Sequence, residues 1–258
     1  MQTLSKIDEV LDTFEAAARS TERLPSTYSG KLGMDDAYRI QLAMLQRRVT
    51  QGAQHIGWKV GLTSSAMQQQ QGVFEPCFGY LLASGQEPSG RSFAFDSLIA
   101  PGFENELCLT IGTTLHGSSV NYESARRAVS HVAPALEIVE KRGTFNRDLP
   151  LSIADNAQQK AFVTGTAIEL DPAVSLAETS VAIMVDGVEQ ERASGAEVLG
   201  DPIHSIVWLA QKLAQFGLPL ERGAKVMSGS FTRQYALQKG HRISACFTPF
   251  GSVSATFV

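Results

Sequence analysis

The chain has 258 residues, of which 43% are hydrophobic and 19% charged, as in an ordinary globular protein that can bury a sizeable core. Its net charge of -4 and the lack of a long Lys/Arg cluster argue against a nucleic-acid partner, because binding to phosphates needs a basic face. No apolar run reaches the roughly 20 residues of a membrane helix, so we expect a small-molecule partner and no membrane association.

The N-terminus and the cysteines indicate the compartment. The first 18 residues lack the basic, apolar and small-residue regions of a secretory signal. Three widely spaced cysteines, Cys77, Cys108 and Cys246, form no Cys-x-x-Cys pair. They are predicted to be reduced thiols in a cytoplasmic protein.

The first 60 residues are predicted to form a helical N-terminal region. Apolar residues recur at helical spacing over residues 7–18 and again over residues 34–50, with turn-forming residues between them. Ser5 and Asp8 offer a capping pattern for the first helix. The remaining residues, 61–258, are predicted to form a separate mixed β body.

A short strand is predicted at residues 55–65, bounded by glycines, with Lys59 between the apolar Trp58 and Val60. Lysines in strands are usually gatekeepers that face solvent. The spacing leaves open whether Lys59 faces solvent or a site.

A polar glutamine segment at residues 67–71 has good helix propensity. Glu75 follows it and precedes Pro76, which favours extended backbone in a loop that could face a cleft.

Two acids begin an otherwise apolar run at residues 101–112. Side chains of a strand alternate between faces, so Glu104, Glu106 and Cys108 share one face. Both carboxylates therefore point the same way. A short strand is predicted just before this run, at residues 97–100.

A third acid lies in a later apolar strand. Residues 121–132 are predicted to form a helix that leads through Pro134 into a strand at residues 135–139. Glu137 lies on the opposite face from Leu136 and Ile138.

The rest of the chain combines strands with one long helix. Asp186-Gly187 predicts a hairpin, because a type I′ turn needs positive φ. Asp201 as N-cap, Pro202, and the closing Gly217 predict a helix up to Phe216. Further strands are predicted at residues 162–165, 225–230, 242–247 and 252–257. The fold class is therefore α+β rather than a regular βαβ series.

Each of the three glutamates taken alone could be an outward-facing charge or a structural ion pair. Converging from two strands, they would leave like charges unpaired in low dielectric unless a cation neutralises them. Carboxylate oxygens suit Mg²⁺, Mn²⁺ or Ca²⁺ better than zinc. Such a site has room for a chelating 2-oxo acid whose carbonyl the metal polarises.

The chain resembles the 2-keto-4-pentenoate hydratase / 4-oxalocrotonate decarboxylase family, which has the fumarylacetoacetate hydrolase fold. The resemblance runs over nearly the whole chain in the family's order. The segments that carry it are Gly57 to Gln68, Glu104-x-Glu106, Pro134-Ala-Leu-Glu137, Ala154-Asp-Asn156, the Trp208 helix, Ser228-Gly-Ser230 and Gly251-Ser-Val-Ser.

The resemblance implies a rolled mixed β-sheet body preceded by a smaller helical region, and usually a homo-oligomer. It also implies a Mg²⁺ or Mn²⁺ site on Glu104, Glu106 and Glu137, with Lys59 as the family's lysine. Val60 and Gln158 would lie beside the substrate, and a complex with a sister hydratase or decarboxylase is a further expectation.

Two positions depart from the family pattern. Cys77 stands where the family commonly has an acid proposed for proton transfer, and Gln158 stands where a serine often lies near the substrate carboxylate. A thiol with a pKa near ~8.5 relays protons only if its surroundings lower that value. Alternatively, Cys77 is a buried residue that fills a gap in the core.

The leading functional hypothesis is a metal-dependent hydratase of a 2-hydroxy-2,4-dienoate that produces a 4-hydroxy-2-oxo acid. Lys59 would orient the substrate carboxylate, while Glu75 and Cys77 are the candidates for proton transfer. Decarboxylation of a 4-oxalocrotonate-type diacid is the close alternative, favoured by an extra cation such as Arg142, Arg147 or Arg233. An acylpyruvate hydrolase, which needs a His-Glu pair, and an inactive partner subunit remain further alternatives.

Overall fold

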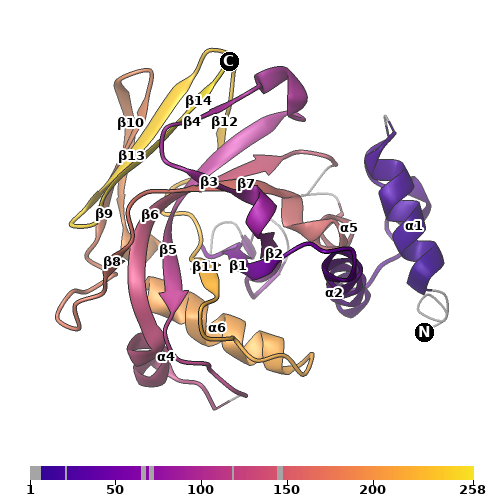
Figure 1. The fold of residues 1–258 in the computed structure, drawn as a ribbon, viewed down its shortest axis with the longest axis horizontal. Coiled ribbons are helices and arrows are strands. Elements are labelled where there is room, and N and C mark those ends of the chain that lie inside the picture. Colours follow the sequence, from indigo (N-terminus) through magenta and orange to yellow (C-terminus); the bar gives the residue numbers. More distant parts are fainter. Residues whose placement is uncertain (1–6, 21, 65–67, 70–72, 118, 144–147) are drawn as a thin grey trace.

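The computed structural model describes residues 7–20, 22–64, 68–69, 73–117, 119–143 and 148–258. Two β-sheets make up the body, and the N-terminal helices lie beside it (Figure 1). The larger sheet curls around its own inner face, and α4 (Tyr122–Ala128) and α6 (Pro202–Ala214) lie at one end of it. The expected α+β class with a rolled mixed sheet is therefore confirmed.

The larger sheet has nine strands, ordered β2-β1-β11-β5-β6-β7-β3, with β12 paired to β5 and β8 paired to β6. The strands are β1 (His55–Gly61), β2 (Cys77–Leu82), β3 (Gln86–Pro88), β5 (Pro101–Ile111), β6 (Val129–Glu140), β7 (Gln159–Thr164), β8 (Ile168–Glu169), β11 (Lys225–Met227) and β12 (Tyr235–Ala236). The two longest strands, β5 and β6, form its centre, and their pairing fixes the site described below.

The smaller sheet has five strands, ordered β10-β9-β13-β14-β4. They are β4 (Arg91–Phe93), β9 (Ser180–Val185), β10 (Val188–Ser194), β13 (Arg242–Thr248) and β14 (Gly251–Phe257). The predicted hairpin joins β9 to β10, where Asp186 and Gly187 both have positive φ, 52° and 78°.

The N-terminal helices are α1 (Ile7–Ala18) and α2 (Met34–Thr50), in agreement with the predicted ranges. Arg47 on α2 holds α1 through Asp8 and Asp12, at 3.0 and 2.6 Å. Gln41 ties α2 to the body by donating to the backbone oxygens of Phe78 and Ile153, the latter on α5 (Leu149–Ala154). The helices end before β1 begins at His55, and the division at residue 60 stays a prediction.

Two predicted elements are wrong. Residues 97–100 form no strand, because Ala100 turns the chain with a φ of 40° and the Ile99 N–H donates to the Glu140 carboxylate. The helix predicted at 121–132 ends at Ala128, because the residues from Val129 onward pair with β5. The β-branched Val129 and Val132 suit a strand better than a helix.

Other predicted elements are present, with bounds that shift by a few residues. The Asp201 carboxylate caps α6 by accepting from the Ile203 N–H at 2.8 Å. Gln68 and Gln69 are helical, whereas the rest of the predicted glutamine segment and the capping Ser5 lie outside the described residues.

The apolar interior has two parts. The main core runs through both sheets and the helices. A second, smaller cluster lies on the other face of the nine-stranded sheet and consists of Leu81, Cys108, Ala133, Ala135, Phe162 and Met227. This second cluster shares its face with the glutamates of β5 and β6, because Cys108 and Glu106 are two residues apart in one strand.

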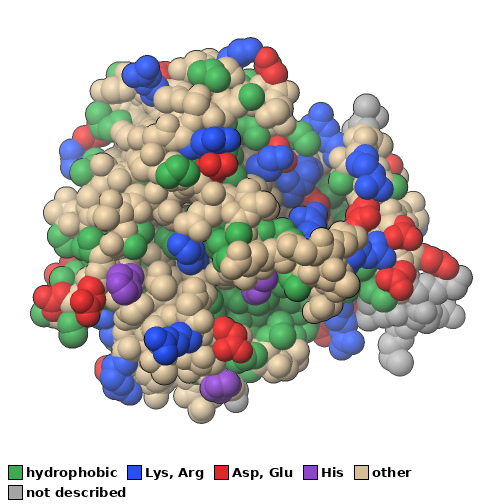
Figure 2. Space-filling model, viewed as in Figure 1, with side chains coloured by type: hydrophobic (Ala, Val, Ile, Leu, Met, Phe, Trp, Pro, Cys, Tyr) green, Lys and Arg blue, Asp and Glu red, His purple; other side chains and the backbone are tan. Residues whose placement is uncertain are grey.

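The surface agrees with the composition. Figure 2 shows acidic and basic side chains interspersed over the visible face. Among the described residues, no helix is long and apolar enough to cross a membrane.

Candidate metal centre

The pairing of β5 with β6 brings three glutamates together. Glu104 lies directly opposite Glu137, and Glu106 lies opposite Ala135, so alternation places all three carboxylates on one face. One carboxylate oxygen from each lies within 4.8 Å of the others. Among the described residues, this is the one such group of three or more possible metal ligands.

The cluster is buried and short of partners. Glu106 and Glu137 are fully buried, and Glu106 Oε1 and both Glu137 oxygens have no hydrogen-bond partner among the described residues. The Gly229 N–H donates to Glu106 Oε2 at 2.8 Å. Buried polar atoms without partners are rare in folded proteins, so three in one cluster fit a site that binds a cation.

The pKa values of the glutamates also indicate a site for a cation. Burial and the neighbouring carboxylate of Glu137 raise the pKa of Glu104 to about 7. Burial, Glu137 and Glu104 also raise the pKa of Glu106 well above its ordinary value. Both shifts follow from the cost of holding like charges close together in a low-dielectric site.

Lys59 supplies a positive charge beside the cluster. Its Nζ lies 3.4 Å from Glu137 Oε1, and its side chain is buried. Burial would lower the pKa of Lys59, but the carboxylates of Glu137, Glu104 and Glu106, with Cys77, raise it above the ordinary value. Lys59 therefore faces the glutamates as an ammonium group rather than solvent.

The donor set fits a hard divalent cation. Three carboxylates offer only oxygen ligands, and Mg²⁺, Mn²⁺ and Ca²⁺ prefer oxygen. One ammonium group offsets one of the three negative charges, and a divalent cation would balance the other two. The unpartnered oxygens of Glu106 and Glu137 are available to hold it.

Cys77 lies on the same face as Lys59. It begins β2 opposite Gly61 of β1, and a Cβ atom at Gly61 would lie 3.3 Å from Cys77 Sγ and 3.4 Å from Lys59 Nζ. Burial raises the pKa of the Cys77 thiol to about 11, although Lys59 acts in the opposite direction. At neutral pH this thiol keeps its proton.

A left-handed turn covers the same strand. Asn156, Ala157 and Gln158 all have positive φ, between 49° and 66°. The Asn156 carboxamide pairs with the backbone of Tyr80 at 2.7 and 3.0 Å, as a neighbouring strand would. A side chain at Gly79 would collide with Asn156, at 2.9 Å, and would press on Lys59 Cγ, at 3.3 Å, so the turn packs directly beside the lysine.

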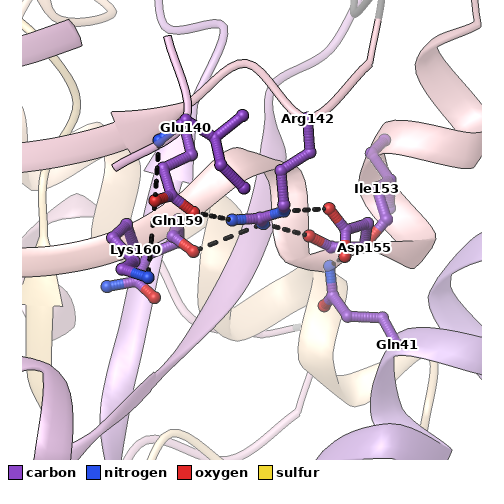
Figure 3. A network of polar contacts seen from close by, with 8 residues as sticks. Gln41, Glu140, Arg142, Ile153, Asp155, Gln159 and Lys160 are labelled. Carbon is purple, nitrogen blue, oxygen red and sulfur yellow. Dashed lines mark hydrogen bonds and ion pairs between the residues drawn. The ribbon is translucent and has the colours of Figure 1, made fainter. Parts of the chain in front are cut away.

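A polar network fixes the start of this turn (Figure 3). Arg142 donates to Asp155 Oδ2 at 2.5 Å and to Glu140 Oε2 at 3.0 Å. It also donates to the backbone oxygens of Asp155 and Gln159, on either side of the turn. Lys160 lies 3.4 Å from Glu140. Arg142 is thereby committed to protein partners.

The comparisons with known proteins agree with this geometry. Residues 88–258 match the model of the fumarylacetoacetate (FAA) hydrolase C-terminal family. The chain belongs to that family.

Two curated relatives match over most of their length. 2-Keto-4-pentenoate hydratase from Paraburkholderia xenovorans is 32% identical over 227 residues, covering 88% of this chain and 84% of the relative. 4-Oxalocrotonate decarboxylase from Pseudomonas putida is 32% identical over 251 residues, covering 97% and 95%.

A solved structure matches the fold closely. The 4-oxalocrotonate decarboxylase from Pseudomonas putida G7, complexed with magnesium and adipate, superposes with a TM-score of 0.90 at 29% identity. The match covers 97% of this chain and 98% of the decarboxylase. The same enzyme has also been solved with calcium and acetate. The resemblance to the hydratase and decarboxylase branch of the FAA hydrolase family is thus confirmed.

None of the remaining predicted site residues belongs to the glutamate cluster. Val60 points its side chain into the main core, so only its backbone could reach a substrate. Glu75 pairs with Lys212 of α6 at 2.8 Å, and Lys212 Nζ lies 5.4 Å from the centre of the Tyr38 ring. Gln158 is buried and ends the left-handed turn.

The arginines considered as partners for a second substrate carboxylate do not lie at the glutamate cluster where the structure describes them. Arg142 belongs to the Glu140 network, and Arg147 lies outside the described residues. Arg233 is 74% exposed, stacks on the Tyr235 ring and lies 3.8 Å from Glu191. His55 bonds to the backbone oxygen of Gly57 and packs edge-on against Trp58, so it does not join the cluster.

Sequence reasoning assigned no role to two residues of this centre. Gly229 holds Glu106 through its N–H and has a φ of 105°, and any side chain there would strike Thr63. The Asn156 side chain hydrogen-bonds to the backbone of β2 in the place that a neighbouring strand would take. Their motifs, Ser228-Gly-Ser230 and Ala154-Asp-Asn156, were visible, but the contacts depend on strands more than 70 residues away.

Proposed function

We propose that this FAA hydrolase family member is a divalent-metal-dependent hydratase. It adds water to a 2-hydroxy-2,4-dienoate to give a 4-hydroxy-2-oxo acid, as in the catabolism of aromatic rings by meta cleavage. The observation that carries the proposal is the buried cluster of Glu104, Glu106 and Glu137, three of whose oxygens lack a hydrogen-bond partner among the described residues, beside the Lys59 ammonium group.

Mg²⁺ or Mn²⁺ held by these carboxylates would supply a Lewis acid that polarises the carbonyl of a 2-oxo acid. Lys59 binds the substrate carboxylate. Its 3.4 Å contact with Glu137 is longer than an ordinary N–H···O bond, so its protons remain available to a ligand. The ammonium also stabilises the negative charge of the enolate-like state, an effect worth ~10²-fold or more.

The apolar cluster on the acid-bearing face suits the hydrocarbon part of a dienoate. Phe162 lies beside Glu137 in the ladder, and Ala135 lies beside Glu106. These side chains keep bulk water from the glutamates, which strengthens the electrostatic contacts there. Water then adds only where the enzyme holds it.

Cys77 holds a proton near Lys59. Because burial raises its pKa to about 11, the thiol acts as a proton donor rather than as a base at neutral pH. Glu75 is the other candidate for proton transfer, although its carboxylate pairs with Lys212.

Decarboxylation of a 4-oxalocrotonate-type diacid is the second candidate, and the fold match to a decarboxylase favours it. Such a substrate carries a second carboxylate, which usually needs its own cation. Among the described residues, Lys59 is the cation that reaches the cluster, whereas Arg142 and Arg233 are engaged elsewhere. Because no second cation reaches the cluster among the described residues, the charges favour the hydratase over the decarboxylase.

We further propose that the enzyme works in the cytoplasm as a homo-oligomer that associates with a sister hydratase or decarboxylase. All three cysteines are free thiols, as expected in a reducing compartment. Phe74 is 98% exposed, and so large an exposed aromatic side chain suits a subunit contact.

One assay set tests the function. The purified protein is given 2-hydroxypenta-2,4-dienoate or 4-oxalocrotonate, each with Mg²⁺, with Mn²⁺ or with EDTA. We expect turnover of the dienoate that EDTA abolishes. An EDTA-resistant rate contradicts the metal mechanism, turnover of 4-oxalocrotonate alone supports the decarboxylase, and turnover of neither supports an inactive partner subunit.

A further inference from the structure

Among the described residues, one buried amide donor next to strand β5 has no hydrogen-bond partner. The side chain of Gln234 lies in the segment that connects β11 to β12. Its Nε2 atom is buried and makes no hydrogen bond among the described residues. A buried amide N–H without an acceptor costs about 1–3 kcal/mol, so its presence calls for an explanation.

The neighbours of Gln234 fix its direction. Tyr235 pairs with Phe103 of β5, and their rings stack at 5.4 Å on the main-core face. Arg233 covers the same Tyr235 ring at 5.1 Å. Since side chains alternate along extended backbone, Gln234 points to the opposite face, where the glutamates lie.

Contacts with β5 agree with this direction. A Cβ atom at Gly102 would lie 2.6 Å from Gln234 Nε2, so the carboxamide occupies the space of a side chain at that position. Gly102 is two residues before Glu104 and therefore shares its face. The β5–β12 register pairs Tyr235 with Phe103, and its next step places Gln234 beside Glu104.

The backbone positions of Lys59 and Gln234 lie on opposite sides of the glutamate pair along β5, and the Lys59 ammonium reaches Glu137 at 3.4 Å. The Lys59 backbone pairs with Met227, which pairs with Cys108, two residues C-terminal to Glu106 on β5. Gln234 lies at Gly102, beyond the N-terminal side of Glu104. A substrate whose carboxylate binds Lys59 and whose 2-oxo group lies at the glutamates would extend its far end toward Gln234.

We infer that the Gln234 carboxamide donates a hydrogen bond to the oxygen on the fourth carbon of the ligand, which is the added water or the product hydroxyl. The inference rests on the proposed hydratase function and deepens it. A neutral amide suits an uncharged hydroxyl, whereas a carboxylate at that end would favour a cation. Gln234 is thus a specificity residue that selects a 4-hydroxy-2-oxo acid.

The test compares two ligands that differ only in that hydroxyl. Calorimetry measures the binding of 4-hydroxy-2-oxopentanoate and of 2-oxopentanoate to the magnesium-loaded protein. One hydrogen bond of about 1–1.5 kcal/mol predicts that the hydroxylated ligand binds about 5- to 10-fold more tightly. Equal affinities for the wild-type protein overturn the inference without any variant.

The variant Gln234→Met keeps an unbranched side chain of similar length and removes the donor. We expect it to bind 2-oxopentanoate and Mg²⁺ as the wild type does, and to lose the 5- to 10-fold preference for the hydroxyl. Gln238→Met, on an exposed residue just after β12, is the matched control and keeps the preference. A preference that survives Gln234→Met overturns the inference.

The two proposals fail in different ways. If the wild type turns over the dienoate but binds both ligands equally, the hydratase stands and Gln234 has no role at the hydroxyl. If the magnesium-loaded wild type binds neither 2-oxo acid, the proposed function fails and the inference falls with it.

Discussion

Strand β6 carries two acids three residues apart that lie in opposite electrostatic surroundings. Glu140 sits between Arg142 at 3.0 Å and Lys160 at 3.4 Å, and it also accepts from the Ile99 N–H (Figure 3). Glu137 faces two other carboxylates and one ammonium, with both oxygens free of hydrogen bonds among the described residues.

The difference separates a structural role from a functional one. A satisfied buried network holds the chain in place, as Arg142 does for the turn at Asp155. An unsatisfied cluster stores unfavourable free energy that a ligand can release. Burial alone does not distinguish them, since Glu137 and Glu140 are both buried.

The most decisive test of this comparison replaces one acid in each region by its neutral amide. Glu106→Gln removes a metal ligand, so calorimetry should detect no Mg²⁺ binding and kcat should fall by about 10³-fold or more, as the loss of several kcal/mol implies. The metal-free stability should stay equal or rise, because one of the repelling carboxyls is gone.

Glu140→Gln is the matched control. It weakens contacts with Arg142 and Lys160, so we expect a loss of about 1–3 kcal/mol of stability in urea unfolding, while Mg²⁺ binding is kept. The comparison is wrong if Glu106→Gln still binds Mg²⁺, or if Glu140→Gln abolishes it.

The next largest effect should come from Lys59, with Lys160 as its control. Lys59→Met is expected to lower kcat/KM by about 10²-fold, because it removes the charge that binds the substrate carboxylate, while Mg²⁺ affinity stays or rises. Lys160→Met, which removes a half-exposed partner of Glu140, should change kcat/KM little. Steady-state kinetics would contradict the assignment if both variants behaved alike.

The pH dependence should differ between the regions. Folding raises the pKa of Glu104 from 4.5 to about 7, so the folded metal-free protein binds protons that the unfolded chain has released. Its stability therefore falls as pH rises from about 4.5 to about 7, and the full cost is present above pH 7.

Because Mg²⁺ must displace those protons, its stabilising effect should be larger at pH 8 than at pH 5.5. Thermal unfolding with and without Mg²⁺ at both pH values measures the difference. Glu140→Gln should show the same dependence as the wild type. An equal gain in Tm at the two pH values would refute the cause assigned to the Glu104 shift.

The smallest effect is expected at Glu75. Its ion pair with Lys212 anchors a loop against α6, and the side chain is 45% exposed. Glu75→Gln should therefore change kcat by less than about 10-fold, whereas loss of a general base costs about 10²–10⁴-fold. A loss in the larger range would make Glu75 the catalytic base and reduce the weight given to its ion pair.

The amino-acid sequence determined much of the fold. The local signals of α2, α6 and the Asp186-Gly187 hairpin were sufficient, because capping residues, helical spacing and positive φ act within a few residues. Local patterns failed at Val129, where pairing with β5 overrode a helix signal. The shared face of Glu104 and Glu106 follows from the alternation of side chains in a strand, so the sequence alone predicts it.

Only the tertiary structure decided which faces meet. The register of β5 with β6 sets Glu137 opposite Glu104 and leaves Glu140 to Arg142, although both acids lie in one apolar strand. The inward direction of Lys59 and the place of Gln234 depend in the same way on strands distant in sequence. A sequence pattern fixes the face of a side chain within its own strand, but the hydrogen-bond register between distant strands fixes what that face meets.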